Sequence, residues 1–344
     1  MSHTVRALSG PGALDFIASS RWESLYEQDT AATPYQSAQW LLGWAEQLPE
    51  TATPVVAICE DLVGRPRAAL ALVRDRVDGR VRTFPLSTPI SEYVRPVGPA
   101  AETSSAAALF GELLDSLLYE GDQVEIPDVP ATSRLGHQLI HAGGGGGWQY
   151  STSQCARIHL PLSYDAMSSS TRREHRRRRR TWDQLDSDNQ VRYRRTQDTD
   201  ELLSAYDALV HLHQRRWGQC ALPSDPASGT DDVRWRDVLR RCGSDTAFIA
   251  TLGLGGQEIV AAQLCLYRGR QAWSVMPAME PDHAHLAPGH AMLRYLADDL
   301  SAHGFRFLDL GRTAPGQHSY KAQYAPQWTS TLSAASAPEA AALA

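Results

Sequence analysis

The sequence predicts an α/β protein of two tandem domains, each a mixed, mostly antiparallel sheet flanked by helices. The chain has 344 residues, of which 42% are hydrophobic, which is enough for two cores. The apolar periodicity indicates the same order of elements twice: a helix, several antiparallel strands, a helix and a strand. We therefore expect an N-terminal domain over residues 1–160, a C-terminal domain over 161–333 and a flexible Ala/Pro/Ser-rich tail over 334–344.

In the first half, helices are expected over residues 38–47 and 106–119, where apolar residues recur with helical spacing. Ser37 is a suitable N-cap for the first of them. The glycine run 143–147 is expected to be a turn, because no helix start follows it directly and a phosphate cradle requires one. Short apolar strands are expected at 54–59, 67–73, 81–84, 123–126 and 148–150.

The second half begins with an arginine-rich helix, expected to open at residues 167–171 and to run to 185, and continues in the same pattern as the first half. Further helices are expected to end at Trp217, to cover 233–242 and to cover 290–302. Strands are expected at 247–252, 258–267, 271–276 and 305–309.

Composition excludes several classes of protein. The net charge of −6 argues against a general binder of nucleic acid or membranes, so no DNA partner is expected. Five scattered cysteines indicate neither a disulfide framework nor a zinc site, and we expect no metal. No apolar run approaches the about 18–20 residues of a membrane span. These observations predict a soluble, cytoplasmic protein.

Lys321 is the only lysine among 33 basic residues, in a chain where arginine otherwise replaces lysine. Burial can lower the pKa of a lysine ammonium, whereas a guanidinium stays charged. This difference favours a functional role for Lys321 over chance survival on the surface. We expect Lys321 to stabilise a developing oxyanion or to neutralise a donor phosphate. Asp309, at a strand end, can accept a proton from a nucleophile. Tyr320 can donate to a leaving group or simply pack.

Two features are candidates for holding a phosphorylated donor. Pro288 and Gly289 open a helix that begins at His290, and such a terminus can bind pyrophosphate, although an ordinary turn explains it equally well. Seven arginines between residues 172 and 180, Arg176 among them, can grip phosphate or simply form a solvated helix. If these arginines face a cleft, they serve the phosphates of one donor. If they form an outer stripe, tRNA or solvation is favoured.

Glu92 and Tyr93 lie in a loop of the first half, where an acid beside a tyrosine can hold or deprotonate an acceptor. The alternative is an exposed loop with a packed tyrosine. The histidines lack the spacing and partners of a zinc site. No Ser-His-Asp arrangement is present, so direct transfer without a covalent enzyme intermediate is the simpler mechanism.

Short motifs occur in a definite order over residues 30–325. They are Thr33–Ser37 with Trp40 and Trp44, Ser91–Tyr93, the Arg-rich helix, Leu212–Gly218, the Pro288–Gly289 helix start, and Asp309–Gly311 with Tyr320–Lys321. As an ordered set they resemble the CelD/BcsL-like branch of the GNAT acyltransferase superfamily. That branch is similar to the FemAB aminoacyl transferases that build peptidoglycan bridges.

The resemblance implies two tandem GNAT-like domains, the first on the acceptor side and the second on the acyl-donor side, with the acceptor in the cleft between them. It places Lys321 at the reaction centre. Two departures are that the superfamily's pyrophosphate signature is only partly echoed by residues 285–291, and that Glu92 stands where Asp is more usual. The candidate donor-binding residues are Pro288, Gly289, His290 and Arg176, and the candidate substrate-binding residues are Tyr93, Arg312, Trp217 and Gln36.

The predicted function is a biosynthetic, GNAT-type N- or O-acyltransferase. It would move an acyl group, in the first instance acetyl, from acyl-CoA to an amine or hydroxyl of a small molecule or of a saccharide or peptide precursor. One alternative is an aminoacyl-tRNA-dependent, Fem-like transferase, in which the arginine helix grips tRNA. The other is a GNAT-derived binding protein that has lost catalysis. The oligomeric state is left open.

Overall fold

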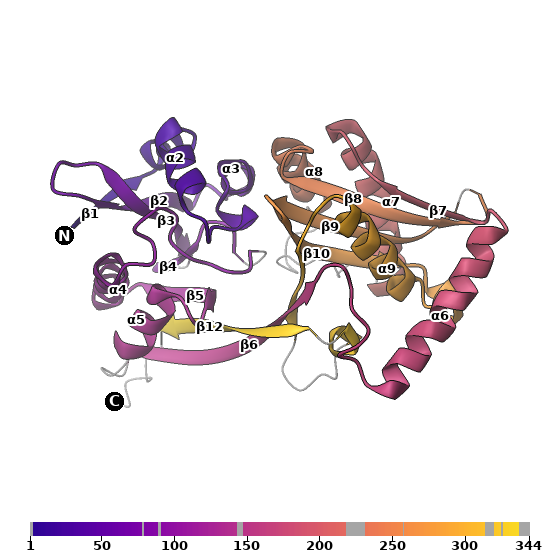
Figure 1. The fold of residues 1–344 in the computed structure, drawn as a ribbon. Helices are drawn as coiled ribbons and strands as arrows, with labels where there is room; N and C mark the ends of the chain where they lie inside the picture. Colours follow the sequence, from indigo (N-terminus) through magenta and orange to yellow (C-terminus); the bar gives the residue numbers. More distant parts are fainter. Residues whose placement is uncertain are drawn as a thin grey trace, which may run out of the picture. The chain divides into compact units, whose positions relative to one another are not determined.

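The computed structural model consists of two compact units, each built around its own part of the sheet (Figure 1). Unit 1 comprises Met1–Gln154 with Thr329–Ala344, and unit 2 comprises Cys155–Trp328. Both are helices packed on a mixed, mostly antiparallel sheet, which confirms the predicted fold class. The structure describes residues 3–77, 79–88, 91–142, 147–217, 231–256, 258–313, 320–324 and 326–336.

In unit 1, antiparallel strands precede a parallel crossover through a helix. The strand order is β1-β2-β3-β4-β5-β12. Strand β4 pairs with β5 in parallel, whereas β1 with β2, β2 with β3, β3 with β4 and β5 with β12 pair in antiparallel fashion. The elements are β1 (Thr4–Ser9), α1 (Pro11–Ile17), α2 (Ser20–Gln28), the 3₁₀ helix η1 (Pro34–Gln36), α3 (Ala38–Ala45), β2 (Ala52–Glu60), β3 (Pro66–Val77), β4 (Arg80–Pro85), α4 (Ser104–Tyr119), β5 (Gln123–Pro130), α5 (Arg134–Ala142), β6 (Trp148–His159) and β12 (Gln327–Ser336).

The core of unit 1 lies between α4 and the sheet. Phe110 and Leu114 of α4 are fully buried against Leu72 and Ile126 of the strands. Ser37 caps α3 as predicted, because its side chain accepts a hydrogen bond from the backbone N–H of Trp40.

Strand β12 differs from the sequence-based boundaries, which placed residues up to 333 in the second domain and began a flexible tail at 334. It pairs with β5, and the Thr331 hydroxyl donates to the buried Asp128 carboxylate at 3.2 Å. Ala334 is fully buried, so 334–336 complete a strand of unit 1 rather than a tail. The rest of the predicted tail, residues 337–344, lies outside the described residues.

Unit 2 repeats this order of elements. The strand order is β6-β11-β10-β9-β8-β7; β7 to β10 are antiparallel and β10 pairs with β11 in parallel. After β6 come α6 (Ser169–Ser187), β7 (Val191–Arg195), α7 (Thr199–Trp217), α8 (Asp231–Cys242), β8 (Ala247–Leu254), β9 (Glu258–Arg268), β10 (Gln271–Met279), η3 (Pro281–Leu286), α9 (Pro288–Ala302), β11 (Phe307–Thr313) and η4 (Tyr320–Tyr324).

Helices α7 and α9 cover opposite faces of this sheet. Tyr193 and Arg195 of β7 both contact Asp299 of α9. Arg192 and Arg194 line a groove beside α7 instead. Because successive side chains of a strand point to opposite faces, the two helices must lie on opposite sides.

Among the described residues, no helix combines the length and apolarity needed to cross a bilayer.

Candidate functional site

Strands β10 and β11 of unit 2 pair over only a short stretch and then separate. Their parallel pairing joins Gln271–Trp273 to Phe307–Asp309, whereas β10 continues to Met279 and β11 to Thr313. The pairing of β10 with β9 shifts register between Ser274 and Met276, which bends β10 at the same point. Within the described ranges, no strand pairs with this edge of β10 beyond Trp273, which suits an extended ligand that carries amide groups.

Helix α9 starts next to the end of β10. Ala287, in the left-handed conformation with φ of 51°, turns the chain into Pro288 at the first helical position. No side chain caps this terminus and its first turn holds no acidic residue. A Cβ on Gly289 would lie 3.1 Å from the sulfur of Met279, a flexible side-chain atom that can shift by a few tenths of an ångström, so alanine is tolerated here. An uncapped helix N-terminus of this kind favours an anionic ligand.

The side chain of His290 contacts Tyr324 of η4. Its Nδ1 lies 2.6 Å from the Tyr324 hydroxyl, and the two rings stack with centroids 5.7 Å apart. Burial, reinforced by the nearby charge of Arg178, lowers the pKa of His290 to about 4, so the imidazole is neutral at pH 7. The side chain of His290 thus holds η4, and its backbone N–H donates to the carbonyl oxygen of Ala287 at 3.0 Å, so neither group is free for the predicted donor-binding role.

Lys321 connects η4 to the end of β11. Its Nζ donates to the carbonyl oxygens of Gly311 at 3.0 Å and Arg312 at 2.6 Å. The Arg312 side chain is exposed, and Tyr320 is partly exposed with its ring edge-on to that of His290. Of this sequence motif, Gly311, Arg312, Tyr320 and Lys321 are described, and they form one local cluster beside the start of α9.

Asp309 is almost fully buried and both of its oxygens have partners. Oδ1 accepts from the backbone N–H of Gly311 at 2.8 Å, and Oδ2 lies 3.4 Å from Nε of Arg157. Trp273 stands opposite in register, so its side chain shares this face of the sheet. Asp309 was expected at a strand end, but β11 continues to Thr313, so Asp309 lies inside the strand. Its contacts suit a residue that fixes β11 better than one that exchanges protons with a bound substrate.

The inner face of α6 packs against the same cluster. Nε2 of His175 lies 3.2 Å from the carbonyl oxygen of Gln323, and Arg178 donates to the side-chain oxygen of Gln323. The indole N–H of Trp182 donates to the carbonyl oxygen of Leu286, just before α9. Sequence reasoning missed His175 and Trp182, although the signal was present: they lie seven residues apart in an otherwise charged helix.

The outer face of α6 carries exposed arginines. Arg173, Arg176 and Arg180 are spaced by three and four residues, so they share one face, opposite His175 and Trp182. Glu174 pairs with its neighbours Arg177 and Arg178, and Asp183 pairs with Arg179 and Arg294, whereas no ion pair within the described ranges involves the three outer arginines. Arg176 therefore points away from the start of α9.

In unit 1, two predicted motifs meet. Nε2 of Gln36 donates to the carbonyl oxygen of Tyr93 at 3.1 Å, and the Trp40 indole N–H donates to the Ser91 hydroxyl at 2.8 Å. Gln36 and Tyr93 are buried, so both side chains hold the loop rather than face solvent. Glu92, between Ser91 and Tyr93, is half-buried.

Trp217 and the glycine run 143–147 lie partly outside the described residues. Trp217 ends α7, and its side chain lies outside the described residues, as do Gly143–Gly146 of the glycine run. Among the described histidines, cysteines and carboxylates, no group of three can hold a metal ion.

Comparison with known proteins agrees with this architecture. Residues 169–322 match the family model described as acetyltransferase (GNAT) domain, which supports a GNAT-superfamily acetyltransferase domain in this part of the chain. No curated protein sequence matches the chain.

Three solved structures show the same overall fold. FemX has a TM-score of 0.60 at 11% identity, covering 95% of this chain and 96% of its own. L-PGS from Bacillus licheniformis has a TM-score of 0.56 at 15% identity, covering 91% and 90%. A tandem GNAT protein from the clavulanic acid biosynthesis pathway has a TM-score of 0.52 at 13% identity, covering 98% and 99%. At these identities the likeness extends to the fold alone.

Proposed function

We propose that this protein is an acyltransferase that moves an acyl group from acyl-CoA to an amine or hydroxyl, with the donor bound by unit 2. The observation that carries the proposal is the uncapped start of α9 beside the separating strands β10 and β11. A pyrophosphate oxygen fits the backbone N–H of Gly289, because Pro288 has no N–H and the N–H groups of His290 and Ala291 donate to the carbonyl oxygen of Ala287. The amides of the pantetheine arm fit the open edge of β10, in the manner of an added strand.

The transfer itself is a direct displacement. The acceptor nitrogen or oxygen forms a bond to the thioester carbonyl carbon, the C–S bond breaks, and the acceptor proton passes to a base while the thiolate leaves. Lys321 is the proposed stabiliser of the oxyanion, because its ammonium is fixed by two carbonyl oxygens beside β11. Tyr320, partly exposed beside Lys321, is the proposed donor to the leaving sulfur.

The acceptor side remains a proposal from the sequence, which assigns it to unit 1. The proposed base is Glu92 or Asp309: the Glu92 residue is half-buried with its Oε2 enclosed, and the Asp309 carboxylate contacts Gly311 and Arg157. Gln36 and Tyr93 would then act by shaping the loop. We also propose that the protein belongs to the CelD/BcsL-like branch, that it is cytoplasmic, and that its acceptor is a biosynthetic precursor of saccharide or peptide type.

The test is a thermal-shift titration with acetyl-CoA and free coenzyme A on three proteins: wild type, Gly289→Ala and Gly289→Asp. A ligand at about 100 times its Kd adds about 2.7 kcal/mol of apparent stability. We expect a clear shift for wild type and the alanine variant, which share the open helix start. Aspartate adds a negative charge there, so its shift should vanish. No shift in wild type, or equal shifts in all three proteins, would overturn the donor assignment.

A second candidate, an aminoacyl-tRNA donor, is favoured by the outer arginines of α6. These exposed side chains are suited to phosphodiesters on a large partner. Each phosphate contact adds about −0.7 to −0.9 to the slope of log K against log salt. Charged tRNA should then bind wild type, and a variant with Arg173, Arg176 and Arg180 changed to Gln should lose about two to three units of that slope. Equal slopes would exclude this donor.

A further inference from the structure

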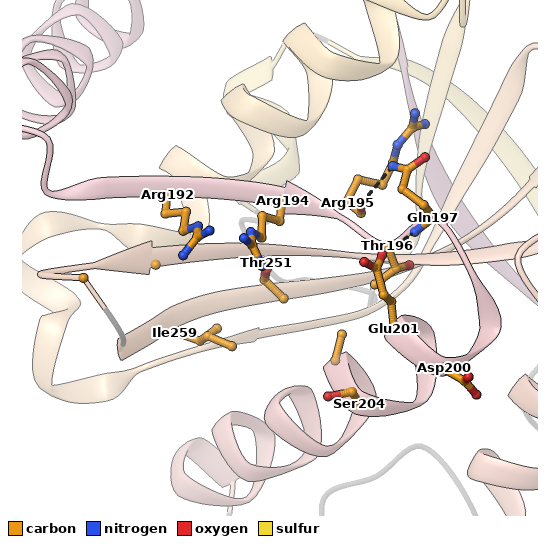
Figure 2. Close-up of a pocket in the computed structure, with 13 residues that line it drawn as sticks. Arg192, Arg194, Arg195, Thr196, Gln197, Asp200, Glu201, Ser204, Thr251 and Ile259 are labelled. Carbon is orange, nitrogen blue, oxygen red and sulfur yellow. Dashed lines mark hydrogen bonds between the residues drawn. The ribbon is translucent and has the colours of Figure 1, made fainter.

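Unit 2 contains a groove of about 860 Å³ that the proposed transfer site does not use (Figure 2). It lies beside β7, the last strand of the sheet order, whereas the proposed donor site lies at β10 and β11. Three inter-strand spacings of about 4.8 Å put about 14 Å between β7 and β10. Besides residues named below, the groove is lined by Thr196, Ala205, Thr251, Gly253, Gly256 and Ile259.

One wall of the groove is positive. Arg192 and Arg194 are exposed and project from the same face of β7, about 7 Å apart along the strand (Figure 2). Neither takes part in an ion pair within the described ranges. Arg195 points to the other face, where its Nε lies 3.3 Å from the Asp299 carboxylate. The register sets Gly253 beside Arg192, which leaves room next to that guanidinium.

The other end of the groove is negative. Asp200 and Glu201 lie in the first turn of α7. The helix start is already capped by its own chain, because the Asp198 side chain accepts from the N–H of Glu201 at 2.8 Å. Glu201 in turn accepts from the N–H of Gln197 at 2.8 Å. A second anion is therefore repelled from this end, and an amine or hydroxyl is attracted to it.

We infer that this groove binds a short, extended zwitterionic ligand of peptide type. Its carboxylate contacts Arg192 and Arg194, and its amino group lies toward Asp200 and Glu201. From Arg192 to Thr196 the strand spans about 14 Å, which is the length of an extended tetrapeptide. The carboxylates disfavour a polyanion such as RNA, which would carry phosphate along the whole groove. This inference does not depend on the proposed acyl transfer.

The experiment is calorimetric titration of the full-length protein with tetraglycine in four forms: free, N-acetylated, C-amidated and blocked at both ends. Tetraglycine isolates the two termini, because it has no side chains. We expect the free form to bind best, each block to weaken binding about tenfold, and the doubly blocked form to bind weakest. Absence of binding by the free form, or equal binding by all four, would overturn the inference.

Variants test which end of the groove binds the carboxylate of the peptide and which binds its amino group. A variant with Arg192 and Arg194 changed to Gln should bind the free and C-amidated peptides equally. Arg306→Gln, which removes an exposed arginine outside the groove, should behave as wild type. Ser204→Trp, on the exposed face of α7, should fill the groove and abolish binding with no change in the melting temperature. If Arg306→Gln weakens binding as much as the double variant, the effect is general charge and the site is excluded.

Discussion

The side chains of Asp309 and Lys321 both form hydrogen bonds with the backbone of one residue, Gly311. The backbone N–H of Gly311 donates to Oδ1 of Asp309 at 2.8 Å, and its carbonyl oxygen accepts from Nζ of Lys321 at 3.0 Å. Gly311 has φ of 73°, a conformation that L side chains rarely adopt. The carboxylate, the glycine and the ammonium therefore act as one unit that sets where the lysine charge lies at the end of β11.

Replacement of Lys321 separates its charge from its structural contacts. Lys321→Ala should lower kcat by about 10²–10³-fold, because the oxyanion loses a preorganised cation. Lys321→Arg keeps the charge but changes the hydrogen-bond geometry, so we expect an intermediate loss. Steady-state kinetics and calorimetric binding of acetyl-CoA measure the two effects.

The informative comparison is between donor affinity and turnover. Donor affinity should stay within a few-fold of wild type in both variants, since the proposed phosphate contacts come from α9. If Lys321→Ala turns over normally, the residue is only structural, and the oxyanion role is excluded.

Gly311→Ala tests whether the conformation of the turn matters. A Cβ at this positive φ costs about 1–2 kcal/mol of folding free energy, which urea unfolding measures. Gly64→Ala is a matched control, because Gly64 has φ of 75° with no atom within 4 Å of an added Cβ and lies in a turn of unit 1. Both variants should lose similar stability, but only Gly311→Ala should lose activity. Retained activity in Gly311→Ala would contradict the coupling of Asp309, Gly311 and Lys321.

Acid should destabilise the cluster around α9 before it affects the rest of unit 2. The pKa of His290 falls from 6.5 in the unfolded chain to about 4 in the fold, so the unfolded state binds the proton more readily. Stability from this residue is complete above pH 6.5 and is lost as the pH falls towards 4. Allowing for partial solvent exposure, the loss is on the order of 1–2 kcal/mol.

Melting curves between pH 7 and 4 measure this loss, and His290→Gln provides the comparison. The variant should be less stable at pH 7 and should show a shallower dependence on pH. Burial also lowers the pKa of His175 and His213, so some pH dependence should persist in the variant. Identical slopes for both proteins would mean that His290 does not titrate abnormally.

Sequence patterns predicted those elements whose signal is local. The buried strands β8, β9 and β10 and the helices α4 and α9 have clear apolar periodicity, and Pro-Gly marked the start of α9. The patterns missed β7, because its Val-Arg-Tyr-Arg-Arg sequence reads as a charged loop, although charge is common on edge strands. They also missed α1, α2, α5 and β1, and they missed β12, whose identity depends on pairing with the distant β5.

The same distinction applies to the candidate site. Lys321, Asp309 and the α9 start stood out by residue type and position, but their contacts did not. Tyr324 joins the site through its contact with His290, and His175 joins it through its contact with Gln323. Both are tertiary contacts between segments far apart in the chain. The arginine run showed its two faces only once the helix was placed against its neighbours, which separated Arg178 on the inner side from Arg176 on the outer side.

The two units share an order of elements but differ at the helix start that would bind a donor. In unit 1 the corresponding helix, α4, is capped by the Thr103 side chain, which accepts from the N–H of Ala106. Glu102 lies just before this cap and pairs with the buried Arg95 at 2.9 Å. A carboxylate and a hydroxyl thus occupy the place that is open in α9, and an incoming pyrophosphate would be repelled.

We therefore expect one donor site per chain, in unit 2. Calorimetric titration with coenzyme A should give a stoichiometry close to one, and Gly289→Asp should abolish it. A variant with Glu102 changed to Gln and Thr103 to Ala, which removes the charge and the cap from α4, serves as the converse test. It should lose about 1 kcal/mol from the missing cap and should still bind a single donor through α9. A stoichiometry of two in wild type would show that the cap on α4 does not exclude the donor, and the asymmetry would then have no functional consequence.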